Sequence, residues 1–248
     1  TDRESTMKKI FLHSKKTKHI WCGHPWVFPK AIAKMEGKPN TGELVSVYDD
    51  KDRCIGVGVF NHHSLYQVRM LAYSHESFQQ DNLESIIDYR LRHAKQLREH
   101  LNLPNQNTTA YRFCNSEGDG LSGLTIDIYH DIAVVSSSAF WVEINKELIQ
   151  KFLKTTFHFE RIIWCSQEKS LKQDGWQDQL EKSNDDFSCV VLEESIAYQI
   201  NFQHIQKTGL FLDQRENHLR IASLCHGKRV LDLYSYTGGF ALHAAKAG

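Results

Sequence analysis

The residues best suited to chemistry lie near the end of the chain, in the segment Asp232-Leu-Tyr234-Ser235-Tyr236-Thr237-Gly238-Gly239. The apolar run at 230–233 predicts a buried strand, and an apolar helix is predicted from Phe240 onward. Two glycines after a strand let the backbone approach a ligand without a Cβ in the way. The N-terminus of the helix then offers free N–H groups and partial positive charge to a carboxylate or phosphate. The segment therefore predicts the first βα unit of a nucleotide-type binding domain.

The glycine spacing argues against a dinucleotide. The dinucleotide fingerprint is G-x-G-x-x-G, and here Tyr234 and Tyr236 stand at its first two glycine positions. A nicotinamide oxidoreductase is thus a weak alternative, which an NADH fluorescence titration would test. The spacing better suits a smaller ligand, such as the amino-acid end of S-adenosylmethionine. A glycine-rich turn that binds nothing also fits the spacing alone.

A second set of residues is basic and aromatic and lies near the N-terminus. Phosphate contacts and stacking on an unpaired base would use such residues, although a solvated lysine face with Trp26 in a barrel core fits the same pattern. Two more basic residues flank the terminal motif and could reach phosphate or cofactor, although Arg215 also suits a plain salt bridge to Glu216 or Asp213. The candidate RNA-binding residues are Lys15, Lys16, Lys18, His24, Trp26, Lys207 and Arg215, with His19 in the same cluster.

The cysteines and histidines predict no metal site. Six cysteines are scattered without a C-x-x-C pair, which argues against zinc and disulfides and fits a reducing, cytoplasmic location. Fourteen histidines show no H-E-x-x-H spacing. Glu117 and Asp119, set between glycines, are expected in a turn rather than at a metal. Cys189 precedes an apolar run typical of a buried strand, so we do not expect it to be a nucleophile.

Composition sets wider bounds. Hydrophobic residues make up 41% and charged residues 24% of the chain, as in ordinary soluble proteins. The formal net charge is zero, so no overall basic field indicates nucleic acid. No apolar run reaches the roughly 18 residues of a membrane span, and no membrane partner is expected. No signal peptide is evident, and residues 1–6 look like an expression remnant.

Patterning divides the chain into three parts. Residues 7–73 hold short predicted strands at 43–47, 54–60 and 65–73, which predict a small barrel. Gly56 and Gly58 in the second strand suggest bending or close backbone approach. Residues 74–190 predict a mixed α/β domain with strands at 111–115, 124–129, 132–137 and 161–165. Residues 191–248 begin the binding domain.

Helices complete this outline. Asp81 is predicted to cap a helix to about Leu101, with an apolar stripe on one side and Arg90 and Arg98 among the solvent-facing residues. A further helix is expected over 142–157, and a polar loop over 166–186. A hairpin at 189–192 and 197–202 precedes a helix capped by Asp213 and running to about Leu224.

Three co-linear segments resemble the RlmI-like family of ribosomal RNA large-subunit cytosine-C5 methyltransferases. They are Gly23-His-Pro-Trp-Val-Phe28 with Ala33-Lys-Met-Glu-Gly37; Ser116-Glu-Gly-Asp-Gly-Leu-Ser-Gly-Leu-Thr-Ile-Asp127; and Gln203-His204 followed by Lys207-Thr-Gly-Leu-Phe-Leu-Asp-Gln-Arg215 and Ser235-Tyr-Thr-Gly-Gly-Phe240. The resemblance covers essentially all of residues 7–248.

The resemblance implies an RNA-binding PUA-like barrel at 7–73, a central α/β domain at 74–190, and the start of a class I, Rossmann-like methyltransferase domain at 191–248. It implies that Tyr234, Ser235, Tyr236, Thr237, Gly238 and Gly239 line the methionine end of S-adenosylmethionine and that Asp232 steadies the loop. The family's ribose-binding acid, its Asp-Pro-Pro-Lys motif and its nucleophilic cysteine in Phe-Ser-Cys-Ser are absent from this sequence.

We therefore expect an S-adenosylmethionine-dependent enzyme that forms 5-methylcytosine in large-subunit (23S) ribosomal RNA, of which this chain is an inactive N-terminal portion. Its catalytic residues are expected beyond Gly248. The alternative is an RNA-binding module without catalysis. The terminal unit at 229–248 is expected to be disordered, packed on the strands of 197–212, or buried in a homodimer.

Overall fold

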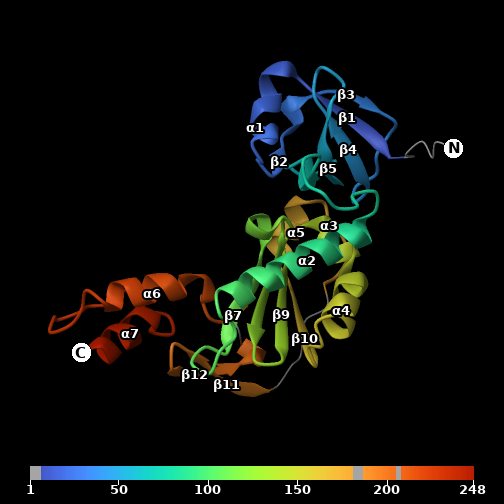
Figure 1. The fold of residues 1–248 in the computed structure, drawn as a ribbon. Coiled ribbons are helices and arrows are strands. Elements are labelled where there is room, and N and C mark those ends of the chain that lie inside the picture. Colours follow the sequence, from blue (N-terminus) through green and yellow to red (C-terminus); the bar gives the residue numbers. More distant parts are fainter. Residues whose placement is uncertain (1–6, 181–186, 205–207) are drawn as a thin grey trace.

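The computed structural model describes residues 7–180, 187–204 and 208–248. The chain folds into a barrel-like sheet, a central α/β unit and a helical arm, arranged in that order along an elongated molecule (Figure 1). The mixed architecture with a curled N-terminal sheet agrees with the fold class predicted from the sequence. Within the described residues, no helix is both long and apolar enough to cross a bilayer.

The N-terminal sheet has the strand order β2-β6-β5-β4-β1-β3, in which β1 and β4 are parallel and the other pairs antiparallel. Gly56 and Gly58 of β5 lie so close to the backbone of β6 that a Cβ at either position would collide with it, as the glycine pattern predicted. The elements are β1 (Lys8–Leu12), α1 (Thr17–Trp21), β2 (Trp26–Val27), β3 (Ile32–Glu36), β4 (Leu44–Tyr48), β5 (Cys54–Phe60) and β6 (Val68–Tyr73), with short 3-10 turns at Ser14–Lys16 and Pro29–Ala31.

The central unit is a four-stranded sheet of order β10-β9-β8-β7, with α2 and α4 on one face (Figure 1). Its strands and helices are α2 (Leu83–His100), β7 (Ala110–Asn115), β8 (Leu124–Tyr129), β9 (Ile132–Ser137), α3 (Phe140–Ile144), α4 (Lys146–Thr155), β10 (Arg161–Ser166) and α5 (Glu168–Gln173), with a 3-10 turn at Ser116–Asp119.

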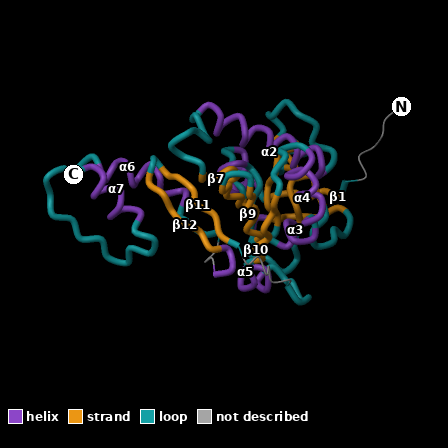
Figure 2. The backbone as a smooth tube through the Cα atoms, turned by 90° about the horizontal axis from the view of Figure 1, so that it is seen from below, coloured by secondary structure: helices purple, strands orange, loops and turns teal. Residues whose placement is uncertain are grey.

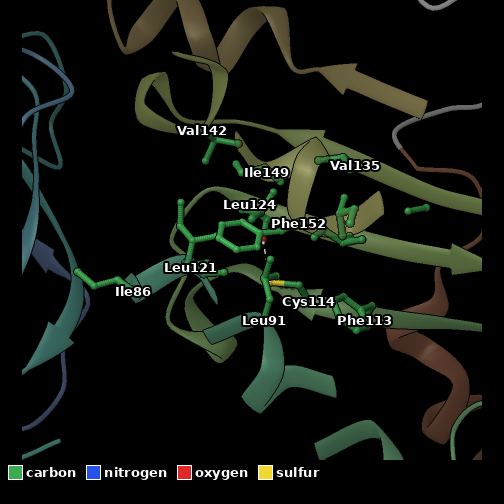
Figure 3. Close-up of a cluster of buried hydrophobic side chains, with 14 of the residues drawn as sticks. Ile86, Leu91, Phe113, Cys114, Leu121, Leu124, Val135, Val142, Ile149 and Phe152 are labelled. Atoms are coloured by element: carbon green, nitrogen blue, oxygen red, sulfur yellow. Dashed lines mark hydrogen bonds between the residues drawn. The ribbon is translucent and has the colours of Figure 1, made fainter. Parts of the chain in front are cut away.

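Successive side chains along each strand point to opposite faces of the sheet, and each face packs into its own hydrophobic core. Leu124 and Val135 point to the face covered by the helices, where they pack with Leu91 and Phe152 (Figure 3). Tyr129 and the other alternate residues point to the opposite face. The helix-covered core also takes in Val57 and Leu71 of the barrel and therefore runs between the two units.

The opposite face is covered by a hairpin of β11 (Ser188–Glu193) and β12 (Ile196–Asn201). The hairpin runs beside the strands of the central sheet in Figure 2. The backbone N–H of Thr109 donates to Leu192 O at 2.9 Å, which ties the hairpin to the edge of the sheet. Turns at Phe202–His204 and Leu212–Gln214 lead to α6 (Arg215–Ala222), which lies beside α7 (Gly239–Ala247) in both views.

Several predicted features of the first two parts are wrong. The cap of α2 is Asn82, whose side chain accepts from the Ser85 N–H at 2.8 Å, and not Asp81. Arg90 and Arg98 are buried rather than solvent-facing, because their guanidinium groups pair with Glu76 and Asp119.

Three errors concern the length or presence of elements. The single helix expected over 142–157 is two helices that meet at Asn145. The loop expected over 166–186 contains α5, whose Leu171 is fully buried, while 181–186 lie outside the described residues. The helix predicted from an Asp213 cap begins at Arg215, with Gln214 at its N-cap and no side-chain cap.

Candidate functional site

The terminal segment forms a loop and a helix, but not the predicted strand. Residues 229–233 have no regular structure, and the Leu231 side chain is 81% exposed. A parallel strand with two apolar faces needs neighbouring strands and covering helices, and no strand of the described residues lies alongside it. The unit packs instead on α6, through α7. The expected packing on 197–212 is observed in part, because Tyr236 contacts Gly209 and Phe211.

The two tyrosines in the loop adopt glycine-like backbones. Tyr234 has φ 61° and Tyr236 has φ 50°, in the left-handed region that non-glycine residues rarely enter. These are the positions that glycines fill in the dinucleotide fingerprint. Strained backbone of this kind concentrates at ligand-binding and catalytic loops, so the loop is a functional-site candidate on geometry as well as on sequence.

Hydrogen bonds hold the loop at both ends. The Asp232 carboxylate accepts from the Ala241 N–H at 3.2 Å, which joins the start of the loop to the first turn of α7. The Gly238 N–H donates to Ser235 O at 2.7 Å. The Tyr236 hydroxyl donates to Gly209 O at 3.2 Å, and its ring contacts Phe211.

The two glycines have different roles. Gly238, with φ 75°, is the N-cap of α7 and needs its conformational freedom. Gly239 is buried, and a Cβ there would lie 2.6 Å from the His218 ring. The second glycine thus makes room for a neighbouring helix, and it also lines the cavity beside the loop.

The turn that receives Tyr236 is fixed by the central sheet. The Tyr129 hydroxyl donates to Thr208 O at 2.9 Å and accepts from the Leu210 N–H at 2.8 Å. The Thr208 hydroxyl donates to Asp127, whose carboxylate also accepts from Arg112 Nε at 2.9 Å. Burial raises the pKa of Tyr129 well above its ordinary range, so its hydroxyl keeps the proton that it donates.

A cavity of about 170 Å³ opens beside the loop. It is lined by Glu193, Tyr198, Leu210, Phe211, Gln214, His218, Asp232, Leu233, Tyr234, Ser235, Tyr236, Thr237, Gly239 and Phe240. Complete ligand pockets usually measure about 300–1,000 Å³. This cavity therefore has room for one end of a cofactor. Six of the seven predicted cofactor residues line it, and Gly238 does not.

The second candidate site lies on the barrel. A cavity of about 610 Å³ is lined by Lys16, His19, Ile20, His24, Trp26, Phe28, Pro29, Lys30, Ala31 and Leu65. Its walls combine exposed amines with aromatic and aliphatic side chains, including a Leu65 that is 77% exposed. Leu65, Phe28 and Lys30 were not among the residues predicted from the sequence, although Phe28 belongs to the Gly23–Phe28 segment that carries the family resemblance.

Trp26 stands at the junction between barrel and central unit rather than in the barrel core. Its ring stacks on Tyr66 at 4.3 Å between centroids. Its indole N–H donates to Glu117 Oε1 at 3.3 Å and to Ser122 Oγ at 3.1 Å. Trp26 also lines a second cavity of about 580 Å³ between the two units.

The remaining predicted residues are placed as follows. Lys15 and Lys18 are exposed beside Lys16 but do not line the barrel cavity. Arg215 pairs with Glu216 at 2.7 Å, one of the two salt bridges considered. It lies on the helical arm, away from the barrel (Figure 1), so the structure does not bring it to the basic cluster. Lys207 lies outside the described residues.

The acidic turn and Cys189 have structural roles. Asp119 pairs with Arg98 Nη2 at 2.8 Å, and Glu117 accepts from Trp26 and Ser122, so these acids serve packing. Cys189 lies in β11, and burial raises the pKa of its thiol. A raised pKa disfavours the thiolate that a nucleophile needs.

Comparisons with known proteins bear on the family and the fold of the chain. Residues 10–73 match the model of a PUA-like domain. Over 242 residues the chain is 31% identical to "Ribosomal RNA large subunit methyltransferase I" of Aeromonas salmonicida, covering 96% of this chain and 60% of that protein. A "Ribosomal RNA large subunit methyltransferase" of Deinococcus radiodurans is 31% identical over 240 residues, 93% of this chain and 58% of the relative.

The predicted family resemblance is thereby confirmed. This chain, a relative of the large-subunit ribosomal RNA methyltransferases with a PUA-like barrel, spans about three-fifths of the length of the curated relatives it matches.

Solved structures support the fold. A methyltransferase complexed with SAH matches with a TM-score of 0.74 at 22% identity, over 97% of this chain and 60% of its own. A structure described as a SAM-dependent methyltransferase from Streptococcus mutans gives 0.73. Identity at this level establishes the fold only.

Proposed function

We propose that this chain supplies the RNA-binding part and the first donor-binding unit of an S-adenosylmethionine-dependent methyltransferase that forms 5-methylcytosine in large-subunit (23S) ribosomal RNA. The observation that carries the proposal is the loop from Asp232 to Gly239, with its two left-handed tyrosines, beside a small cavity. The proposed division is 7–73, 74–190 and 191–248. Its ribosomal RNA partner would place the protein in the cytoplasm.

The loop and the helix after it suit the amino-acid end of the donor. Gly239 and Phe240, the first residues of α7, line the cavity, so the positive end of the helix faces it. That end would attract the donor's carboxylate. The volume of about 170 Å³ accommodates this end alone. S-adenosylmethionine would supply the electrophilic methyl group.

The barrel cavity suits an unpaired nucleotide. Lys16 and Lys30 on its rim would contact phosphate, and Phe28 and His24 offer ring faces to a base. Trp26 is less available, since Tyr66 covers one side of its ring. Because the net charge of the chain is zero, this local grouping and not a general basic field would hold the RNA.

Methylation at cytosine carbon 5 requires more than these sites. Carbon 5 is a poor nucleophile until a thiolate adds to carbon 6, with acid assistance at N3. None of the described cysteines lies among the residues that line the donor cavity. We therefore propose that the 248-residue chain alone does not transfer methyl groups.

One experiment tests both halves of the proposal. The 248-residue chain and a complete relative from Aeromonas salmonicida are incubated with labelled donor and unmodified 23S RNA, and nucleosides are analysed by mass spectrometry. The expected result is 5-methylcytidine with the relative and none with the chain, which nevertheless retains the RNA in a filter assay.

Three outcomes would contradict it. Turnover by the chain itself would show that its catalytic apparatus is already present. RNA retention with no donor binding by calorimetry, in a complete protein that contains this chain, would favour an RNA-binding module without catalysis. Absence of RNA binding would remove the role of the barrel.

A further inference from the structure

Three buried groups of a kind that binds metals lie together beside the cavity, and two of them, Glu193 and His218, line it. Glu193 at the end of β11, His218 in α6 and His243 in α7 are 2%, 7% and 3% exposed. One candidate ligand atom from each lies within 4.8 Å of the other two. No metal site was predicted from the sequence, because these residues share no motif. The fold brings them together from three elements.

The orientation of His243 is the decisive observation. Its Nδ1 donates to the backbone carbonyl of Gly239 at 2.8 Å, which fixes the tautomer and leaves Nε2 to offer a lone pair. That Nε2 is buried and has no hydrogen-bond partner among the described residues. It faces Glu193 Oε1 at 3.6 Å, beyond hydrogen-bond distance. In a neutral ring, a lone pair directed at a carboxylate oxygen in a buried site is unfavourable unless a proton or a metal ion lies between the two atoms.

The neighbours complete a ligand set. Glu193 Oε1 also lies 2.7 Å from His218 Nδ1, so one carboxylate oxygen faces both imidazoles. The unpartnered hydroxyl of Tyr198 is buried close by and lines the same cavity as Glu193 and His218. A histidine that binds metal usually donates its other N–H to a carbonyl or carboxylate, which is the contact that His243 makes with Gly239.

We propose that Glu193, His218 and His243 bind one zinc-class divalent transition-metal ion. Two imidazole nitrogens and one carboxylate oxygen are a known zinc ligand set, with a fourth position left to water. Ligands about 2.0–2.1 Å from a tetrahedral ion lie about 3.3 Å from one another. The 3.6 Å pair meets this with little change, and the 2.7 Å pair opens by about 0.6 Å.

The ion would join α6 and α7, which already pack on each other, to the β11–β12 hairpin. It would fix α6 and α7 to the hairpin and so hold the first turn of α7, next to Gly238 and Gly239, against the central unit. This role is independent of the proposed methyl transfer, because it concerns the placement of helices and not the donor.

Cobalt(II) tests the site without an activity assay. The 248-residue chain is stripped with chelator and titrated with cobalt(II), and then with zinc(II) in competition. We expect one ion per chain, visible absorption bands typical of tetrahedral cobalt, and displacement by zinc. His218→Ala and His243→Ala should each weaken binding by more than the roughly 10- to 100-fold that loss of an outer hydrogen bond costs.

The matched controls are two exposed histidines, His100→Ala in α2 and His226→Ala near the chain end, which should leave binding unchanged. Equal binding by His243→Ala and wild type, or no stoichiometric uptake by the wild type, would overturn the proposal and leave a plain Glu193–His218 hydrogen bond. If a variant does not fold, X-ray absorption at the zinc edge of the wild-type chain decides the same point. A spectrum with two imidazole ligands around the ion would support the site, and a spectrum without imidazole ligands would refute it.

Discussion

Arg69 of β6 and Asp174, which follows α5, form a buried ion pair that joins the barrel to the central unit. The Nη2–Oδ2 distance is 3.2 Å, and the side chains are 8% and 6% exposed. Arg69 Nη1 also donates to Ser122 Oγ at 3.0 Å, and the Asp174 carboxylate accepts from the Phe140 N–H. Charged groups at this depth are tolerated because each one is paired, so the pair fixes how the two units meet.

Asp174→Asn should destabilise the chain strongly. Removing one partner leaves Arg69 as an uncompensated buried charge, which typically costs about 3–5 kcal/mol. Urea denaturation measures the loss of unfolding free energy. The control is Glu36→Gln, which removes an exposed pair with Lys34 and should leave the free energy of unfolding nearly unchanged. Equal effects of the two substitutions would show that the buried pair does not hold the units together.

Glu117 gives the junction a dependence on pH. Burial alone would raise the pKa of its carboxyl group, but hydrogen bonds from Ser122 and Ser116 outweigh burial and hold the pKa below the ordinary 4.5. A lowered folded-state pKa means that this stabilisation is present above pH 4.5 and is lost as the pH falls through the folded-state value.

A comparison of the wild type with Glu117→Gln checks whether the stabilisation by Glu117 is lost as the pH falls. We expect a difference in unfolding free energy of about 1 kcal/mol near neutral pH, since the group is only partly buried. The difference should shrink toward zero as the buffer is acidified below pH 4.5. A gap that widened in acid would refute the assignment.

The glycine pair predicts two different substitution effects. Gly239→Ala places a methyl group 2.6 Å from the His218 ring, and such overpacking typically costs about 1–3 kcal/mol. Gly238→Ala meets no close atom, with Leu242 at 3.6 Å, but puts a side chain at φ 75°, at a cost of about 1–2 kcal/mol.

Hydrogen exchange separates the two. Gly239→Ala should speed exchange in both α6 and α7, because it pushes the helices apart. Gly238→Ala should speed exchange mainly in the first turn of α7. The same pattern in both variants would contradict the distinction.

Lys16 should govern part of the salt dependence of RNA binding. If its amine contacts one phosphate, Lys16→Gln lowers the log–log salt slope by about 0.7 on single-stranded RNA. Lys51, exposed in the turn after β4, provides the matched substitution Lys51→Gln, for which no change is expected. Fluorescence anisotropy across a salt series measures both slopes. A slope unaffected by Lys16→Gln would place the phosphate elsewhere.

The cysteines should react with iodoacetamide in a fixed order. Cys22 is exposed and should be modified first. Burial raises the pKa of the Cys54 and Cys189 thiols, so less thiolate is available there. Cys114 is fully buried and should react only after unfolding. Peptide mass spectrometry follows each site over time, and early modification of Cys189 would reopen its candidacy as a nucleophile.

Local patterning predicted much of the fold. The strands at Cys54–Phe60, Leu124–Tyr129 and Ile132–Ser137 were predicted at their observed bounds, because apolar runs between clear turn residues carry their own limits. The hairpin and the glycine contacts between β5 and β6 were also foreseen. What could not be foreseen depended on partners distant in sequence: Arg90 is buried because Glu76 is there to pair with it, and α5 forms where Leu171 finds a core.

The sites show the same division. The loop after Asp232 could be found from the sequence because its tyrosines and glycines lie close together along the chain. The left-handed backbone of the two tyrosines could not be predicted, because backbone angles in a loop depend on the contacts that hold it. Leu65 was missed because it was assigned to the predicted strand at 65–73, whereas β6 begins at Val68 and leaves Leu65 exposed before it. The Glu193–His218–His243 group was missed because only the packing of α7 on α6 brings its members within reach of one another.

The Tyr129 hydroxyl group has a consequence for how the parts communicate. One oxygen atom secures the residues on both sides of Gly209, and the carbonyl of Gly209 in turn holds Tyr236. A displacement of strand β8, which begins four residues after the Gly120 turn beside the barrel junction, would thus reach the loop before α7 through the Tyr129 oxygen and through Asp127, which accepts from the Thr208 hydroxyl. Tyr129→Phe would remove one of these two links and weaken the coupling while leaving the aromatic packing of the sheet in place.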